Sequence, residues 1–281
     1  ELSRFAELVK SPEHIHTFRI SPLSLWNASA SGVTSAEMIA TLERWSKYPI
    51  PQNLLQEIQD HGSRYGRLRL VRQGDRLALE MEDRGLFWEL EHQKSLADLL
   101  EAPYPDQRGI YLRPGSRGEI KLRLIRLGHP VQDLAGFKDG DPLPFALRDT
   151  QAGSNRPFAL RPYQKAAADV FHAGGGPDGG AGVLVLPCGA GKTVIGIACM
   201  ARLQTHTLVL TTNGTAVKQW KQELLDKTTL TEAQIGLYTG DVKEIRPVTI
   251  ATYQILTYRK AKEAPFEHFK LFEAANWGLV I

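Results

Sequence analysis

The stretch Leu186-Pro187-Cys188-Gly189-Ala190-Gly191-Lys192-Thr193 decides the fold of the region around it. It directly follows the apolar run 182–185 and precedes the amphipathic segment 194–198, so we expect a strand, a glycine turn and a helix in that order. Gly189 and Gly191 allow backbone conformations that other residues avoid, which lets successive N–H groups turn inward at the positive end of the helix. The stretch therefore predicts a loop that binds phosphate.

The residues that end this loop make the prediction more specific. Lys192 is placed to contact the β- and γ-phosphates of a nucleotide, and Thr193 is placed to hold Mg²⁺, as in a Walker A loop. The full pattern has a glycine where this chain has Leu186, so only a shorter core is present, a form that superfamily-2 helicases and translocases commonly use. We predict binding of ATP and Mg²⁺, with Lys192 and Thr193 as catalytic candidates. The predicted nucleotide contacts in the loop are Cys188, Gly189, Ala190, Gly191, Lys192 and Thr193.

Composition limits the class of protein. A chain of 281 residues has room for two or three domains, and 42% hydrophobic with 23% charged residues is typical of a globular rather than a disordered or fibrous protein. A net charge of +3 permits a nucleic-acid partner without requiring one. Two cysteines do not make a disulfide framework, and the eight histidines lack zinc spacing. With no secretory or membrane-spanning pattern, we expect a soluble intracellular protein.

The ends of the sequence suggest that it is part of a longer chain. It opens at Glu1 without a methionine and stops at Ile281 inside an apolar run. We expect the chain to be a fragment.

The region 14–83 predicts three helices and a hairpin. Helices are expected at 23–30 after Ser21-Pro22, after the capping box Thr34 to Glu37, and after Pro51. Alternating apolar residues on both sides of Gln73-Gly74-Asp75 predict a hairpin at 68–81. This order is typical of a winged-helix-like module that binds nucleic acid or a protein partner. The third helix carries amides and acids rather than bases, which favours a protein partner.

The segment 86–155 concentrates positive charge in one place. Five basic residues fall within 113–126, opposed only by Glu119. The apolar alternation there suits a strand, but Ser116 and Glu119 form a capping-box pattern, so we predict a helix, with strands at 110–112 and 145–147. The basic run is either a solvated face or a contact with DNA phosphates. The candidates for that contact are Arg113, Arg117 and Arg123.

From Phe158 onward, strands and helices alternate, which predicts a doubly wound parallel sheet. A helix should begin at Arg161-Pro162 and run through Phe171, and 174–182 should be a flexible connector. The predicted strands are 183–186, 207–210, 235–237, 248–250 and 278–281. The predicted helices among them are the one that follows the glycine loop, to about residue 203, and 216–225, 253–262 and 266–275.

Taken together, these motifs resemble those of the XPB family of superfamily-2 DNA helicases. Arg161-Pro162-Tyr163-Gln164 resembles the family's Q motif, and Leu186–Thr193 resembles its motif I, including the Pro-Cys pair. The segment 212–221 is similar to motif Ia, and 251–253 with 277–281 is similar to motif Ic and the approach to motif II. Residues 24–26 and 65–66 resemble the family's N-terminal domain, and 120–147 is similar, more weakly, to its damage-recognition domain.

The resemblance implies an overall α/β architecture of three domains. These are a winged-helix-like domain at 1–90, a damage-recognition-like α+β domain at 91–155, and a first RecA-like domain at 156–281. It also implies that Gln164, with Arg161, contacts adenine, and that Thr212, Thr252 and Lys218 contact DNA phosphates. Trp220 is expected to be a core residue rather than a base-stacking platform. Because the acidic motif II would begin after residue 281, the chain alone is not expected to turn over ATP.

The function implied is that of an ATP-driven helicase or translocase on double-stranded or forked DNA, in repair or promoter opening. Its partners would be a nuclease or a repair or transcription complex, and no membrane. It would act in the cytoplasm or nucleoid of a prokaryote or the nucleus of a eukaryote. Two alternatives stay open: a restriction-type superfamily-2 translocase subunit, and a non-catalytic module that binds protein or DNA.

Overall fold

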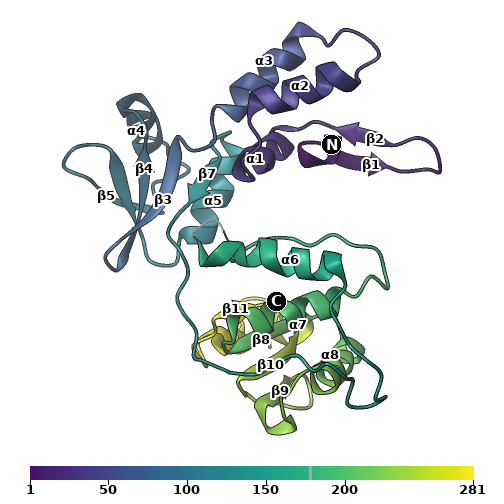
Figure 1. The fold of residues 1–281 in the computed structure, drawn as a ribbon. Helices are drawn as coiled ribbons and strands as arrows, with labels where there is room; N and C mark the ends of the chain where they lie inside the picture. The colour runs from purple at the N-terminus through teal and green to yellow at the C-terminus, as the bar shows by residue number, and fades with distance from the viewer. Residues whose placement is uncertain (177–178) are drawn as a thin grey trace. The chain divides into compact units, whose positions relative to one another are not determined.

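The computed structural model describes residues 1–176 and 179–281, and the chain divides into two compact units, Glu1–Gly136 and Phe137–Ile281 (Figure 1). Both units are mixtures of helices and strands, which confirms the predicted α/β class. The predicted connector 174–182 includes residues 177 and 178, which lie outside the described residues.

The first part of unit 1 is a set of three helices beside a hairpin. The strands β1 (Glu7–Lys10) and β2 (Thr17–Arg19) pair antiparallel after the short 3₁₀ helix η1 (Leu2–Arg4). The helices α1 (Pro22–Ala30), α2 (Ser35–Trp45) and α3 (Gln52–Gly62) confirm the three predicted helices. Ser21 and Thr34 cap α1 and α2 as expected, and Met38 and Ile58 are fully buried between the helices. The hairpin β1–β2 was not predicted, because its mostly exposed side chains leave no alternating pattern.

The second part of unit 1 is a five-stranded sheet. The predicted hairpin forms as β3 (Leu68–Gln73) and β4 (Arg76–Met81), followed by α4 (Arg84–Glu91), β5 (Leu100–Pro103), β6 (Gly109–Leu112), α5 (Arg117–Arg126) and β7 (Val131–Asp133). The strand order is β5-β6-β4-β3-β7, with β7 parallel to β3 and the other pairs antiparallel.

One hydrophobic core joins the hairpin to the segment that follows it. Leu79 on β4 and Ile110 on β6 face each other in the ladder, and both belong to the core that also contains Phe87 on α4 and Leu124 on α5. A lone hairpin is marginal in water, so it gains stability from further strands and helices on its apolar face. The expected division between residues 90 and 91 therefore falls inside one sheet and one core.

Two local predictions in this region need correction. Helix α5 is confirmed, but Ser116 does not cap it, because its hydroxyl donates instead to the Arg113 carbonyl at 2.7 Å. The strand predicted at 145–147 is wrong, since Leu147 makes only an isolated bridge with Thr228. Phe145 is buried in the core of unit 2, so its hydrophobicity serves packing rather than a strand.

Unit 2 is built on a parallel sheet of order β11-β8-β10-β9. Its strands are β8 (Thr207–Thr211), β9 (Ile235–Tyr238), β10 (Val248–Thr252) and β11 (Leu279–Val280). Its helices are α6 (Pro162–His172), α7 (Lys192–Leu203), α8 (Gly214–Lys227) and α9 (Tyr253–Leu256). Three short 3₁₀ helices complete it: η2 (Ala173–Gly175), η3 (Glu232–Gln234) and η4 (Glu267–Phe272).

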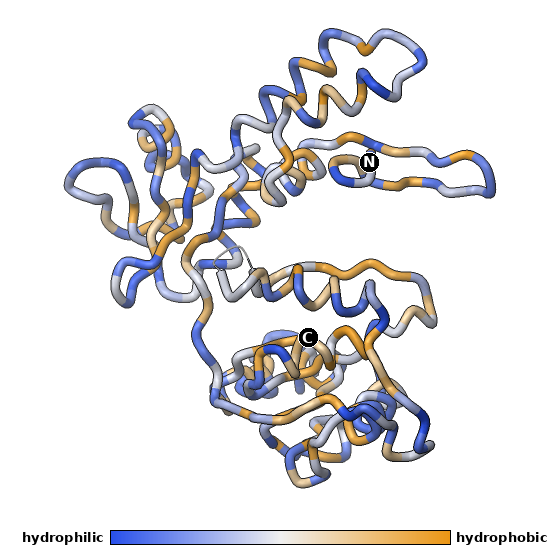
Figure 2. Tube along the Cα trace, viewed as in Figure 1, coloured by the Kyte–Doolittle hydropathy of each residue, from blue (hydrophilic) through white to orange (hydrophobic). Residues whose placement is uncertain are grey.

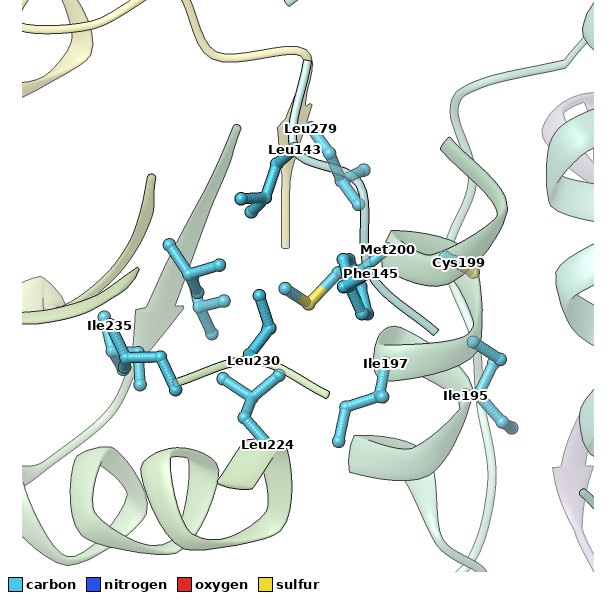
Figure 3. Close-up of a cluster of buried hydrophobic side chains, with 14 of the residues drawn as sticks. Leu143, Phe145, Ile195, Ile197, Cys199, Met200, Leu224, Leu230, Ile235 and Leu279 are labelled. Atoms are coloured by element: carbon cyan, nitrogen blue, oxygen red, sulfur yellow. The ribbon is translucent and has the colours of Figure 1, made fainter. Parts of the chain in front are cut away.

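Apolar side chains cover both faces of this sheet, as a doubly wound fold requires. Neighbours on β8 alternate: Val209 belongs to the cluster that includes α7 and α8, whereas Leu208 belongs to the cluster with α9 and η4. Figure 3 shows the first cluster, in which Ile197 and Met200 of α7 and Leu224 of α8 converge with Leu279 of β11. The buried face of α7 therefore packs against this core and fixes the position of the helix, including its first turn.

The strand predicted at 183–186 is wrong. These residues form no strand, and the side chains of Val183 and Val185 are 92% and 85% exposed. Figure 2 shows the run in orange, following the grey trace after α6. An apolar pattern predicts a strand only if a neighbour offers a hydrogen-bonding edge, and no described strand pairs with this segment. The predicted helices 253–262 and 266–275 also shorten, to α9 and η4.

Candidate nucleotide-binding site

The predicted phosphate-binding loop has the backbone that its glycines permit. Gly189 and Gly191 have φ of 78° and 79°, in the left-handed region that side chains disfavour. Gly191 is the N-cap of α7, and no side chain caps the helix, so the first N–H groups of α7 are left to a ligand or to water. A 12-residue helix with these free donors presents a positive end to an anion.

Lys192 lies at the first position of α7 and bends back over the loop. Its Nζ donates to the carbonyls of Leu186 at 2.8 Å and Pro187 at 3.0 Å. The side chain is exposed, and no carboxylate lies within ion-pair distance of it in the described part of the chain. A phosphate could therefore replace two neutral carbonyls without first breaking an ion pair.

The other loop residues are placed as follows. Thr193 is partly exposed in the first turn of α7, and Cys188 is an exposed free thiol. Cys199 lies on the buried face of the same helix, where burial raises the pKa of its thiol. The described residues contain no cluster of three histidine, cysteine or acidic side chains suited to a metal. Any Mg²⁺ here would depend on Thr193 together with phosphate oxygens.

The N-terminal turn of α6 packs against the loop. Gln164 is buried; its Oε1 accepts from the Arg161 N–H at 2.9 Å, and its Nε2 lies 3.5 Å from the Ala190 carbonyl. That Nε2 also stands 2.5 Å from where a Cβ on Gly191 would lie, so a side chain at this position would collide with Gln164. The structure thus brings Arg161 and Gln164 together with the loop that they were predicted to serve.

Tyr163 is a residue of this site to which the sequence assigned no role. Its hydroxyl donates to the Ala190 carbonyl at 2.5 Å, and the Arg161 guanidinium lies 3.5 Å from the Tyr163 hydroxyl oxygen. The only signal in the sequence was its position inside the stretch 161–164, because a tyrosine there is equally compatible with a solvated helix face.

Two of the predicted DNA contacts in unit 2 meet at one edge of the sheet. Thr252 ends β10 and pairs with Thr211, the last residue of β8, so Thr212 and Thr252 lie at the carboxyl ends of adjacent parallel strands. Thr252 is buried, and its hydroxyl accepts from the Ile255 N–H to cap α9. Lys218 is exposed and lies within α8, not at the end of either strand. Trp220 packs against the core, which confirms its predicted role.

The basic run lies in unit 1 and is largely paired within the fold. Arg117 and Lys121 contact the Asp133 carboxylate at 2.9 and 2.8 Å, and Arg123 contacts Asp98 at 2.5 Å and also Glu119. Burial alone would raise the pKa of Asp133, but hydrogen bonds from its two cationic partners outweigh it and lower that pKa. Arg113 differs, since its exposed guanidinium makes one long contact, 3.4 Å, to the Leu100 carbonyl.

No helix among the described residues has the length and apolar character needed to span a membrane. A glycine loop that opens a helix beside a parallel sheet is typical of P-loop nucleotide-binding proteins. Residues 157–273 match the family described as type III restriction enzyme, res subunit, and residues 1–102 match the helicase conserved C-terminal domain.

Named relatives narrow this class. The chain is 45% identical, over its whole length, to the DNA 3'-5' helicase XPB of Mycobacterium tuberculosis, of which it covers 49%, and 43% identical to that of Kineococcus radiotolerans, of which it covers 48%. It is 29% identical to the general transcription and DNA repair factor IIH helicase/translocase subunit XPB of Antonospora locustae, again over its whole length and 41% of that protein.

A solved structure, the UvsW helicase from bacteriophage T4, aligns with 76% of this chain and 80% of its own at 16% identity and a TM-score of 0.39. The sequence relatives show that the chain is similar, over its whole length, to DNA helicases and helicase/translocase subunits named XPB. It spans about half the length of the curated bacterial relatives it matches, at 49% and 48%.

Proposed function

We propose that this chain is the nucleotide- and DNA-binding part of an ATP-dependent helicase or translocase that acts on double-stranded or forked DNA, in repair or promoter opening. The observation that carries the proposal is the glycine loop at the start of α7, where Lys192 is exposed and, among the described residues, contacts backbone carbonyls rather than an acid. We assign this loop to a first RecA-like domain at 156–281. The names of the bacterial relatives, DNA 3'-5' helicases, support the reaction class.

Each loop residue has a task in binding ATP. The free N–H groups at the start of α7 and the Lys192 ammonium would neutralise the β- and γ-phosphates, which carry the charge that develops during phosphoryl transfer. The Thr193 hydroxyl would help to hold Mg²⁺, which would supply positive charge next to those phosphates. Gln164 and Arg161 would meet the adenine, at the position where α6 approaches the loop.

DNA would be bound mainly through its phosphates. Thr212, exposed at the sheet edge, and Lys218 on α8 suit contacts to one strand that are independent of sequence. Thr252 is proposed as a third contact from the same edge, although it is buried and its hydroxyl caps α9. In the basic run, Arg113 is the best placed of the three candidates, because Arg117 and Arg123 are already neutralised by acids. The winged-helix-like and damage-recognition-like assignments of 1–90 and 91–155 remain part of this proposal.

The setting of the activity follows from the same proposal. A relative named as a subunit of transcription and DNA repair factor IIH makes a repair or transcription complex a reasonable partner, with a nuclease as the other candidate. The site of action would then be the nucleoid of a prokaryote or the nucleus of a eukaryote.

The experiment that tests the proposal uses the whole protein. ATP hydrolysis is measured with and without duplex DNA, for the wild type, Lys192→Ala and the control Lys165→Ala, an exposed lysine on α6. We expect DNA to stimulate hydrolysis in the wild type and the control but not in Lys192→Ala. Absence of stimulation in the wild type would refute the proposal. The match of 157–273 to a restriction-enzyme subunit keeps a restriction-type translocase as the second candidate, and ATP-dependent DNA cleavage by the whole protein would favour it.

A further inference from the structure

We propose that Tyr163 is a positioning residue that orients an amide of the phosphate-binding loop. This inference rests on the proposed nucleotide site and adds to it a residue of α6 that acts through the backbone rather than by touching the base. It begins from the hydrogen bond, 2.5 Å long, that the Tyr163 hydroxyl donates to the Ala190 carbonyl.

Ala190 lies between two glycines whose backbones tolerate more than one orientation. Gly189 and Gly191 both have φ near +80°, at 78° and 79°, and glycine adopts either sign of φ at little cost. The peptide plane between Ala190 and Gly191 could therefore rotate in the absence of an external contact. Tyr163 supplies one from outside the loop, and Gln164 Nε2 adds a second, longer one to the same carbonyl at 3.5 Å.

Fixing that carbonyl also fixes a donor. The peptide unit is planar and trans, so the Ala190 C=O and the Gly191 N–H point in opposite directions. When Tyr163 holds the carbonyl on the side of α6, the Gly191 N–H must point away from α6. Within the described residues this N–H has no acceptor, which leaves it available to an anion at the N-terminus of α7.

The position of Tyr163 explains why its effect should be moderate. Tyr163 as a whole residue is 39% exposed, so the hydrogen bond to Ala190 forms partly in water. One neutral hydrogen bond in such a place changes an affinity by about five-fold. Because the effect operates through phosphate binding, it should be independent of the base.

The test compares Tyr163→Phe, which removes only the hydroxyl, with Tyr258→Phe, a matched control at a tyrosine that is 51% exposed. Dissociation constants are measured on the full chain for a fluorescent ATP analogue and, by competition, for inorganic tripolyphosphate. We expect Tyr163→Phe to weaken both ligands by about five-fold and the control to leave both unchanged. The Gly191 amide resonance of the ligand-free chain should shift in Tyr163→Phe alone, a readout that does not depend on binding.

The outcomes separate this inference from the proposed function. Loss of binding in Lys192→Ala with wild-type affinities in Tyr163→Phe would overturn the inference and leave the nucleotide site standing. Weakening of the ATP analogue without weakening of tripolyphosphate would also overturn it, because Tyr163 would then contact the base. Wild-type binding by Lys192→Ala would instead refute the nucleotide site itself.

Discussion

The loop at Lys192 and the basic run of unit 1 both contain basic residues, but the fold pairs these residues with different partners. Lys192 is exposed, and in the described part of the chain its ammonium contacts two backbone carbonyls and no carboxylate. Arg117 and Arg123 instead contact the carboxylates of Asp133 and Asp98, and both arginine side chains are only 25% exposed. The charge of Lys192 is therefore not neutralised by an acid among the described residues. In the basic run, the ion pairs of Arg117 and Arg123 neutralise most of the charge and attach α5 to the rest of unit 1.

This difference shows that a cluster of basic residues is weak evidence for a phosphate site. Neighbours in sequence do not reveal which acids the fold brings back to them: Asp98 comes from the loop before β5, and Asp133 from the end of β7. Lys192 differs from these arginines, because the groups beside it in sequence are the uncapped backbone N–H groups at the start of α7 and not carboxylates. Four predictions test this comparison.

The largest effect is expected from Lys192→Ala. Removing the Lys192 ammonium should weaken binding of a fluorescent ATP analogue by on the order of 100-fold, because a charge-assisted contact to phosphate is lost. Isothermal titration of the full chain measures the change. Lys165→Ala should bind as the wild type does, and a similar loss there would show that general charge, not the loop, attracts the nucleotide.

The second prediction concerns Asp133→Asn, which removes the shared partner of Arg117 and Lys121. The free energy of unfolding of unit 1 should fall by about 2 kcal/mol, since two partly buried cations lose their acid. Hydrogen exchange of the β3 and β7 amides under native conditions measures it. The control Asp75→Asn, in the exposed β3–β4 turn, should change stability by less than about 0.5 kcal/mol. Unchanged exchange in Asp133→Asn would mean that the ion pairs do not hold the unit together.

The third prediction is a pH dependence of unit 1. Because the folded state lowers the pKa of Asp133, its stabilising contribution is present above the unfolded pKa and is lost as pH falls through the folded value. Unit 1 should therefore lose stability as pH falls below about 5. Asp133→Asn should lose less over the same range. Parallel pH curves for the two proteins would contradict the assignment of this loss to Asp133.

The smallest effect is expected from Arg113→Gln. If Arg113 touches a DNA phosphate, the slope of log K against log salt for duplex binding should become shallower by about 0.9. Fluorescence anisotropy over a series of salt concentrations measures it. Arg123→Gln should leave the slope unchanged, because Asp98 and Glu119 already neutralise that guanidinium. An equal change in both variants would indicate that the ion pairs open onto DNA.

Local signals in the sequence predicted much of the fold. Ser21 and Thr34 cap the helices they were expected to cap, the turn at Gly74 forms the β3–β4 hairpin, and strands β8, β9 and β10 appear where predicted. These features depend on side chains three or four residues apart, or on a strand's own alternation. The prediction of a strand at 183–186 was wrong, because a strand also needs a neighbouring strand to pair with, and the residues of the segment itself do not show whether one is present.

The sequence by itself determined the glycine loop at the start of α7, because its glycines and Lys192 lie within a few consecutive residues whose backbone conformations are local. Only the tertiary structure decided which charges remain available and which residues brace the loop. Asp133 reaches Arg117 across 16 positions, and Tyr163 reaches Ala190 across 27. Such contacts arise from packing between helices and strands. Burial of apolar side chains sets how these elements lie against each other, and polar groups then form hydrogen bonds with the neighbours that this packing brings close.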